Sequence, residues 1–98
     1  MSRLADFLGM LDDAALIAAA NKGVLIRASK DAGSGKVTLD AHDDATAQLR
    51  MDAEAITLDA KGLAACRCTC PAPGTCRHQV AAILFVARTE EMVKTHIV

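Results

Sequence analysis

The sequence predicts an α+β fold in a single small domain over residues 1–98, and three observations predict it. Apolar side chains near the N-terminus follow a helical period, whereas those of residues 24–62 alternate with polar ones. Residues 66–78 then hold four cysteines and a histidine, and an apolar segment without glycine or proline follows them. We therefore expect an N-terminal helical segment at 1–23, an antiparallel β-meander at 24–62, and a strand, loop and core helix at 63–95.

The N-terminal segment is expected to form two short helices. A second helix can begin at Asp12 or Asp13, because an aspartate side chain accepts hydrogen bonds from the free N–H groups of a helix start. The run of residues 21–23 (Asn-Lys-Gly) is expected to end that helix. The apolar residues of the first helix, spaced to share one face, are Leu4, Phe7, Leu8 and Leu11.

The alternating region predicts four strands separated by short polar turns. Alternation of this kind favours antiparallel strands with one buried face, which a helix must cover. Residues 63–70 can continue as a final strand into the cysteine segment. The apolar positions of the four strands are Val24, Ile26 and Ala28, then Val37, Leu39 and Ala41, then Leu49 and Met51, and finally Ile56, Leu58 and Ala60.

Every cysteine of the chain lies in residues 66–78, which read Cys-Arg-Cys-Thr-Cys-Pro-Ala-Pro-Gly-Thr-Cys-Arg-His. Thiolate and imidazole are the preferred ligands of tetrahedral zinc. Disulfide frameworks spread their cysteines along a chain, so this local group favours a metal site over disulfides. The chain has twenty alanines and two aromatic residues, so its core buries little area per residue. A bound metal would supply stability that such a core lacks.

Zinc needs four ligands, and the segment offers five candidates. Cysteines two apart on a strand have Cα atoms about 6.6 Å apart on one face, which lets both sulfurs reach one ion. The strand pair is therefore either Cys66 with Cys68, or Cys68 with Cys70. We select the second pair because Pro71 ends the strand directly after it. The predicted metal ligands, two on the strand and two at the start of the final helix, are Cys68, Cys70, Cys76 and His78.

Cys66 is then left over. We expect it to be a small buried residue under the final helix, and a replacement ligand or a free, redox-active thiol are the alternatives. A site closed by four protein ligands has no position for water or substrate, so the predicted role of the zinc is structural.

The cysteine segment resembles the SWIM-type zinc finger. The matching residues are Cys68-Thr69-Cys70-Pro71, then Cys76-Arg77-His78, and then the apolar helix that starts at Gln79. The resemblance covers about residues 56–88. It implies that Cys68, Cys70, Cys76 and His78 bind Zn²⁺ within a ββα-like unit, and that the unit recognises DNA or a protein partner.

The charge distribution leaves both kinds of partner open. Residues 1–60 carry six basic and ten acidic side chains, whereas residues 61–98 carry five basic and two acidic ones. The mildly positive second part suits nucleic acid, but the chain has no Tyr or Trp to stack on bases. The alternative is a protein-interaction module of a larger assembly without nucleic-acid binding. The basic residues of the second part are Lys61, Arg67, Arg77, Arg88 and Lys94.

Other function classes are not expected. We find no nucleophile paired with a base, and interpret His42 beside Asp43 and Asp44 as a polar hairpin turn rather than an acid–base site. We therefore expect neither an enzyme nor a small-molecule substrate. The longest apolar run, residues 80–87, is too short to cross a bilayer. Without a secretory signal in the sequence, we expect a cytoplasmic protein.

Overall fold

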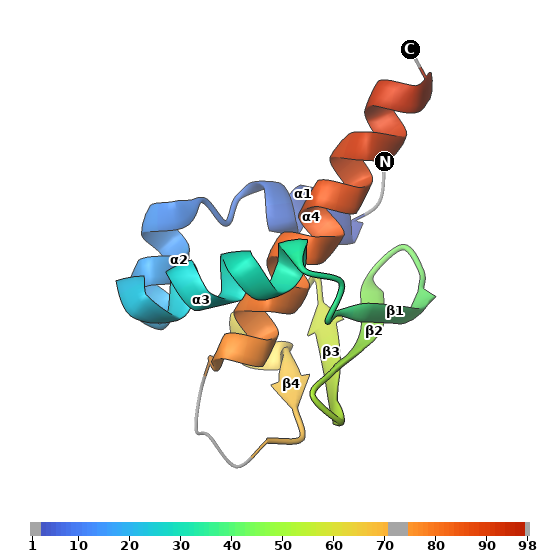
Figure 1. Cartoon of the computed structure of the whole chain (residues 1–98). Coiled ribbons are helices and arrows are strands. Elements are labelled where there is room, and N and C mark those ends of the chain that lie inside the picture. The colour runs from blue at the N-terminus through green and yellow to red at the C-terminus, as the bar shows by residue number, and fades with distance from the viewer. Residues whose placement is uncertain (1–2, 71–74, 98) are drawn as a thin grey trace.

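The structure, a computed structural model, describes residues 3–70 and 75–97. These residues form N-terminal helices, a four-stranded antiparallel sheet and a C-terminal helix (Figure 1), which confirms the predicted α+β class. The helices are α1 (Arg3–Gly9), α2 (Asp13–Ala19), α3 (Lys22–Gly33), the 3-10 helix η1 (Leu63–Ala65) and α4 (Arg77–Ile97). The strands are β1 (Thr38–His42), β2 (Thr46–Met51), β3 (Glu54–Asp59) and β4 (Arg67–Cys68).

The sheet is a meander in the order β1-β2-β3-β4. Strands β2 and β3 pair in continuous register, whereas the register of β1 and β2 shifts between Leu39 and Ala41. Strand β4 pairs with β3 at only two positions, Ile56 with Cys68 and Thr57 with Arg67. The strand that leads into the cysteine segment is therefore held to the sheet by a short ladder.

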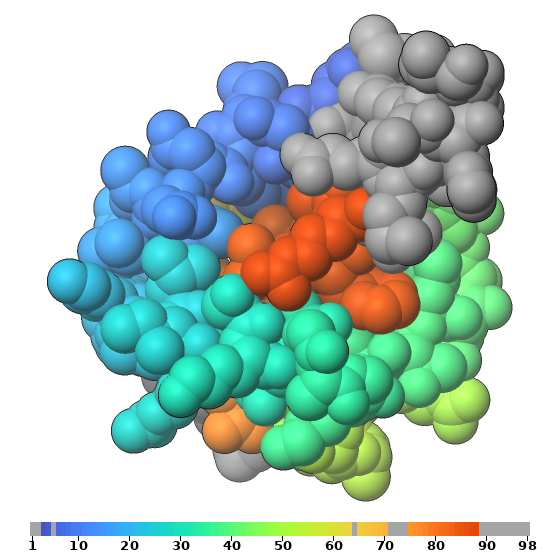
Figure 2. All heavy atoms as spheres, turned by 45° about the horizontal axis from the view of Figure 1, so that its top comes forward, coloured from blue at the N-terminus to red at the C-terminus, as the bar shows by residue number. Residues whose placement is uncertain are grey.

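Helix α4 is the central element of the core. It passes between the N-terminal helices and the sheet (Figure 1), and in Figure 2 its coloured residues lie between those of the N-terminal helices and those of the strands. The alternating apolar residues of β2 and β3 point to this helix, as expected for a sheet with one covered face. The largest fully buried side chains are Leu4, Leu16, Leu49, Met51, Ile56, Leu58, Ile83, Val80 and Val86.

The two short N-terminal helices are confirmed. Asp12 caps α2, and its Oδ1 accepts a hydrogen bond of 2.8 Å from the backbone N–H of Ala15. Leu4 and Leu8 of α1 are buried in the core, so the predicted apolar face of this helix is the one that packs inward.

The predicted strand over residues 24–29 is wrong, because this stretch lies in α3. Asn21, expected to help end the preceding helix, caps α3 and accepts a hydrogen bond of 2.8 Å from the N–H of Val24. A short apolar run can match both a period of two and a helical period. Packing against α4 decides here, because the helical spacing buries Ala28 and Ala32 together.

The remaining strands and the final helix are confirmed, with one change. The expected strand over residues 63–70 is reduced to β4 and is preceded by η1. Helix α4 begins at Arg77, so that His78 lies in its first turn as expected, and extends to Ile97. No helix among the described residues is both long enough and apolar enough to span a membrane.

The β2–β3 hairpin turns through two residues with positive φ, Asp52 at 53° and Ala53 at 66°. Met51 and Glu54 pair on either side of them, so the loop has two residues. Such a loop favours Asn, Asp or Gly, because other side chains are strained in the left-handed region. Asp52 suits its position, whereas Ala53 does not.

Ala53→Gly is expected to stabilise the protein by about 0.5–1 kcal/mol. Glycine removes the left-handed strain, and its extra entropy in the unfolded chain offsets part of the gain. Thermal unfolding monitored by circular dichroism measures the change. Ala55→Gly is the matched control on the exposed side of β3, where the same substitution is expected to lower stability. A lower melting temperature for Ala53→Gly would contradict the prediction.

Candidate metal centre

Four donor side chains meet where β4 faces the beginning of α4. Cys68 pairs with the buried Ile56, so its side chain lies on the covered face of the sheet. Cys70 follows two residues later, and Cys76 and His78 lie at the start of α4. The loop of residues 71–74, expected to turn the chain back, lies outside the described residues.

The donor atoms of these residues all lie within 4.8 Å of one another. The Sγ atom of Cys76 lies 3.9 Å from Nδ1 of His78. Two sulfurs bound to one tetrahedral zinc ion at about 2.3 Å lie roughly 3.8 Å apart. The observed spacing is therefore close to that of a tetrahedral site, and a small inward movement of the side chains would complete it.

Without a metal ion, the thiol of Cys68 favours its protonated form. Burial, together with the neighbouring side chains of Cys70 and Cys76, raises the pKa of Cys68 to about 12, although a backbone hydrogen bond acts to lower it. A bound divalent cation reverses this preference, because a coordinating thiol loses its proton. Three thiols and one imidazole match the ligands that zinc takes in structural sites, so the residues fit this metal.

The start of α4 contributes a positive electrostatic potential at the cluster. Cys76 directly precedes the helix, and its carbonyl oxygen accepts a hydrogen bond of 3.1 Å from the N–H of Val80. His78 is the second residue of the helix. The partial positive charge at a helix N-terminus stabilises thiolates nearby.

Residues 48–87 match the family model of the SWIM zinc finger. The chain contains a SWIM zinc finger. The resemblance seen in residues 56–88 is thus confirmed, and the match extends back into β2. No curated protein and no solved structure matches the chain. The SWIM finger comprises part of β2, all of β3, η1 and β4, the Cys/His cluster and the first half of α4.

Cys66 is buried within the SWIM finger but does not belong to the cluster. Its Sγ accepts a hydrogen bond of 3.5 Å from the N–H of Asp59 and donates one of 3.4 Å to the carbonyl oxygen of Gly62. Burial raises the pKa of this thiol. Cys66 is therefore the small buried residue that we expected, and it fills the turn between β3 and η1.

Arg77 lies between two donors in the sequence and contacts two carboxylates beside the cluster. Its terminal nitrogen NH2 donates a hydrogen bond of 3.0 Å to Oδ2 of Asp52, and its Nε lies 3.2 Å from Oδ2 of Asp31. Oδ2 of Asp52 also lies 3.7 Å from Nε2 of His78. These aspartates were missed by the sequence analysis, because they are far from the cysteine segment in the chain and follow no motif.

His42 ends β1, and residues 43–45 form the expected polar turn between β1 and β2. The Oδ1 atom of Asp43 accepts hydrogen bonds from the N–H groups of Ala45 and Thr46. These bonds hold the pKa of Asp43 below its usual value. The Cys/His cluster is the metal-competent group found among the described residues, and it includes none of these side chains.

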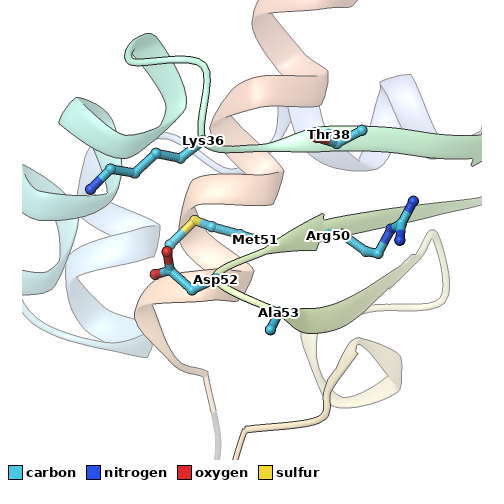
Figure 3. A pocket seen from close by; sticks show the side chains of 6 residues that line it. All are labelled: Lys36, Thr38, Arg50, Met51, Asp52 and Ala53. Atoms are coloured by element: carbon cyan, nitrogen blue, oxygen red, sulfur yellow. The ribbon is translucent and has the colours of Figure 1, made fainter.

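A shallow hollow of about 280 Å³ lies beside the β2–β3 hairpin (Figure 3). Its two cations, Lys36 and Arg50, point in opposite directions, and each lies near a carboxylate. Nζ of Lys36 is 3.7 Å from Oδ1 of Asp31, and Nε of Arg50 is 2.6 Å from Oδ2 of Asp40. The hollow therefore has no pair of cations aimed at a common point where an anionic ligand could bind.

Proposed function

We propose that this protein is a zinc-stabilised interaction module, in which Cys68, Cys70, Cys76 and His78 hold one structural Zn²⁺ ion. The observation that carries the proposal is the convergence of four donor atoms within 4.8 Å inside a SWIM finger. Four protein donors complete a tetrahedral shell and leave no open position for catalysis. Cysteines that stay reduced to bind a metal are typical of a reducing compartment, which supports a cytoplasmic location.

Metal analysis tests the zinc site directly. Protein purified under reducing, zinc-replete conditions is expected to contain one zinc ion per chain, measured by mass spectrometry under native conditions. Denaturing spectra of the same sample give the mass of the bare chain as the control. A folded protein without bound metal would contradict the proposal.

The arginines of α4 support a protein partner over DNA. Arg77 is engaged by Asp31 and Asp52. The guanidinium of Arg88 donates to Oγ of Ser29 at 2.9 Å and to its carbonyl oxygen at 3.4 Å. Both arginines therefore hold parts of the fold together, and their replacement would disturb the protein before it disturbed any contact with phosphate.

The exposed surface of the finger is poorly suited to a polyanion. The finger exposes Arg50, Lys61 and Arg67, of which Arg50 pairs with Asp40, whereas DNA-binding proteins often neutralise about 6–10 phosphates. The helical layer instead exposes three large apolar side chains, and apolar contacts suit a protein partner. They are Met10, Ile26 and Ile17, which are 77%, 49% and 37% exposed.

A titration of the zinc-loaded protein with labelled DNA separates the two partners. We expect no saturable binding to single- or double-stranded DNA at about 50 mM salt. Affinity that falls steeply with salt, and is lost in the double variant Lys61→Glu, Arg67→Glu, would favour DNA instead.

For a protein partner, crosslinking after nuclease treatment is expected to yield a defined complex that Ile26→Asp weakens. Ser29→Asp is unsuitable as a control because Ser29 binds Arg88, whereas Lys22→Asp introduces the same charged side chain at the exposed start of α3.

A further inference from the structure

The two ring nitrogens of His78 face different groups. Nδ1 lies 3.9 Å from Sγ of Cys76, on the side of the donor cluster. Nε2 lies 3.7 Å from Oδ2 of Asp52, which is on the hairpin between β2 and β3. The ring thus stands between the thiol of Cys76 and the carboxylate of Asp52, with one nitrogen close to each.

We propose that Asp52 is a positioning residue of the metal centre, whose carboxylate accepts the Nε2–H of His78 and thereby makes Nδ1 the metal-binding atom. This inference rests on the proposed zinc site. Histidines that bind metals usually donate the other ring N–H to a carboxylate or carbonyl group, which fixes the tautomer and the ring orientation. When the cluster closes on the metal, we expect the contact between His78 and Asp52 to shorten to hydrogen-bonding distance.

Asp52 is itself held in place from two sides. The backbone is fixed by the two-residue hairpin, where a positive φ of 53° suits aspartate. The carboxylate accepts a hydrogen bond of 3.0 Å from Arg77, whose Nε is in turn 3.2 Å from Oδ2 of Asp31 in α3. In Figure 3, Asp52 stands at the tip of the hairpin, beside the first turn of α4.

Arg77 therefore has a role at the metal centre, although it does not itself bind the metal. Its guanidinium holds the Asp52 carboxylate beside the His78 ring and links it to α3. The side chain of Asp31 is only 13% exposed, so its ion pair with Arg77 is shielded from water and from salt. The hairpin, α3 and the metal site are therefore connected through one carboxylate.

Two substitutions test the role of Asp52 without disturbing its turn. Asn and Gly both favour positive φ, so Asp52→Asn and Asp52→Gly keep the hairpin. Asp40→Asn is the matched control. Asp40 lies on β1 and pairs with Arg50 of β2, and no ion pair joins it to His78 or Arg77 among the described residues. Zinc affinity is measured by competition with a chromophoric chelator. We expect Asp52→Gly to raise the dissociation constant about 10- to 100-fold, Asp52→Asn to raise it less, and Asp40→Asn to leave it unchanged.

Nitrogen NMR of the zinc-loaded protein provides a readout that a purely structural role would not alter. In the wild type, we expect Nδ1 of His78 to be metal-bound and Nε2 to carry a proton that exchanges slowly with water. In Asp52→Gly, this proton is expected to exchange faster while the protein remains folded.

The outcomes are distinguishable. Coordination through Nε2, or zinc affinities of both Asp52 variants within about twofold of the Asp40→Asn control, would overturn the role of Asp52 and leave the zinc site intact. Failure of the wild-type protein to bind zinc would overturn the proposed function, and this inference with it.

Discussion

Removal of the metal by a strong chelator is expected to unfold the protein, starting where β4 meets α4. Strand β4 is held by two residue pairs, and the helix that begins beside it carries the buried Val80, Ile83 and Val86. Structural zinc in finger peptides binds with about 10–16 kcal/mol, which is comparable with the roughly 5–15 kcal/mol stability of a typical domain. Without the free energy of zinc binding, the alanine-rich core is expected to be too weak to keep the protein folded.

Circular dichroism during a chelator titration measures this effect, with readdition of zinc to show reversibility. Chelator already saturated with zinc is the matched control. Hydrogen exchange locates the change, and we expect protection to fall first in residues 63–70 and 75–90. An unchanged thermal transition after complete removal of the metal would contradict the prediction.

Substitution of the cysteines one at a time is expected to divide them into two classes. Cys68→Ser, Cys70→Ser and Cys76→Ser each remove one of four ligands, so each is expected to cost roughly a quarter of the zinc binding energy, about 3 kcal/mol. Cys66→Ala leaves the ligands in place. It removes a buried sulfur and is expected to cost about 1 kcal/mol of stability, with zinc affinity unchanged.

Cobalt substitution reports the result through visible absorption, because the band positions depend on how many thiolates bind. Wild type and Cys66→Ala are expected to share one spectrum, and the three serine variants are expected to lose intensity in the thiolate charge-transfer region. Loss of metal in Cys66→Ala would show that the wrong strand pair was selected. A serine variant with wild-type affinity would remove that residue from the proposed ligands.

Local patterns predict most of the secondary structure. The alternation of β2 and β3 and the uninterrupted apolar stripe of α4 are each long enough to specify one period. The stretch at residues 24–29 does not specify one, because Val24, Leu25 and Ile26 are consecutive apolar residues that fit a strand or a helix, and α3 forms because its alanines pack on α4. The cysteine pattern predicts where donors gather, because Cys68 and His78 are close in the chain and a turn suffices to bring them together.

The sequence by itself determined the α+β class, the presence of a SWIM finger and the place of its Cys/His cluster, since all of these follow from neighbours along the chain. Only the tertiary structure decided that Arg77 contacts Asp31 and Asp52, and that Asp52 stands beside His78. These partners come from α3 and from the β2–β3 hairpin. Their meeting depends on how α4 packs between helices and sheet, and such packing is a property of the whole core that no local spacing encodes.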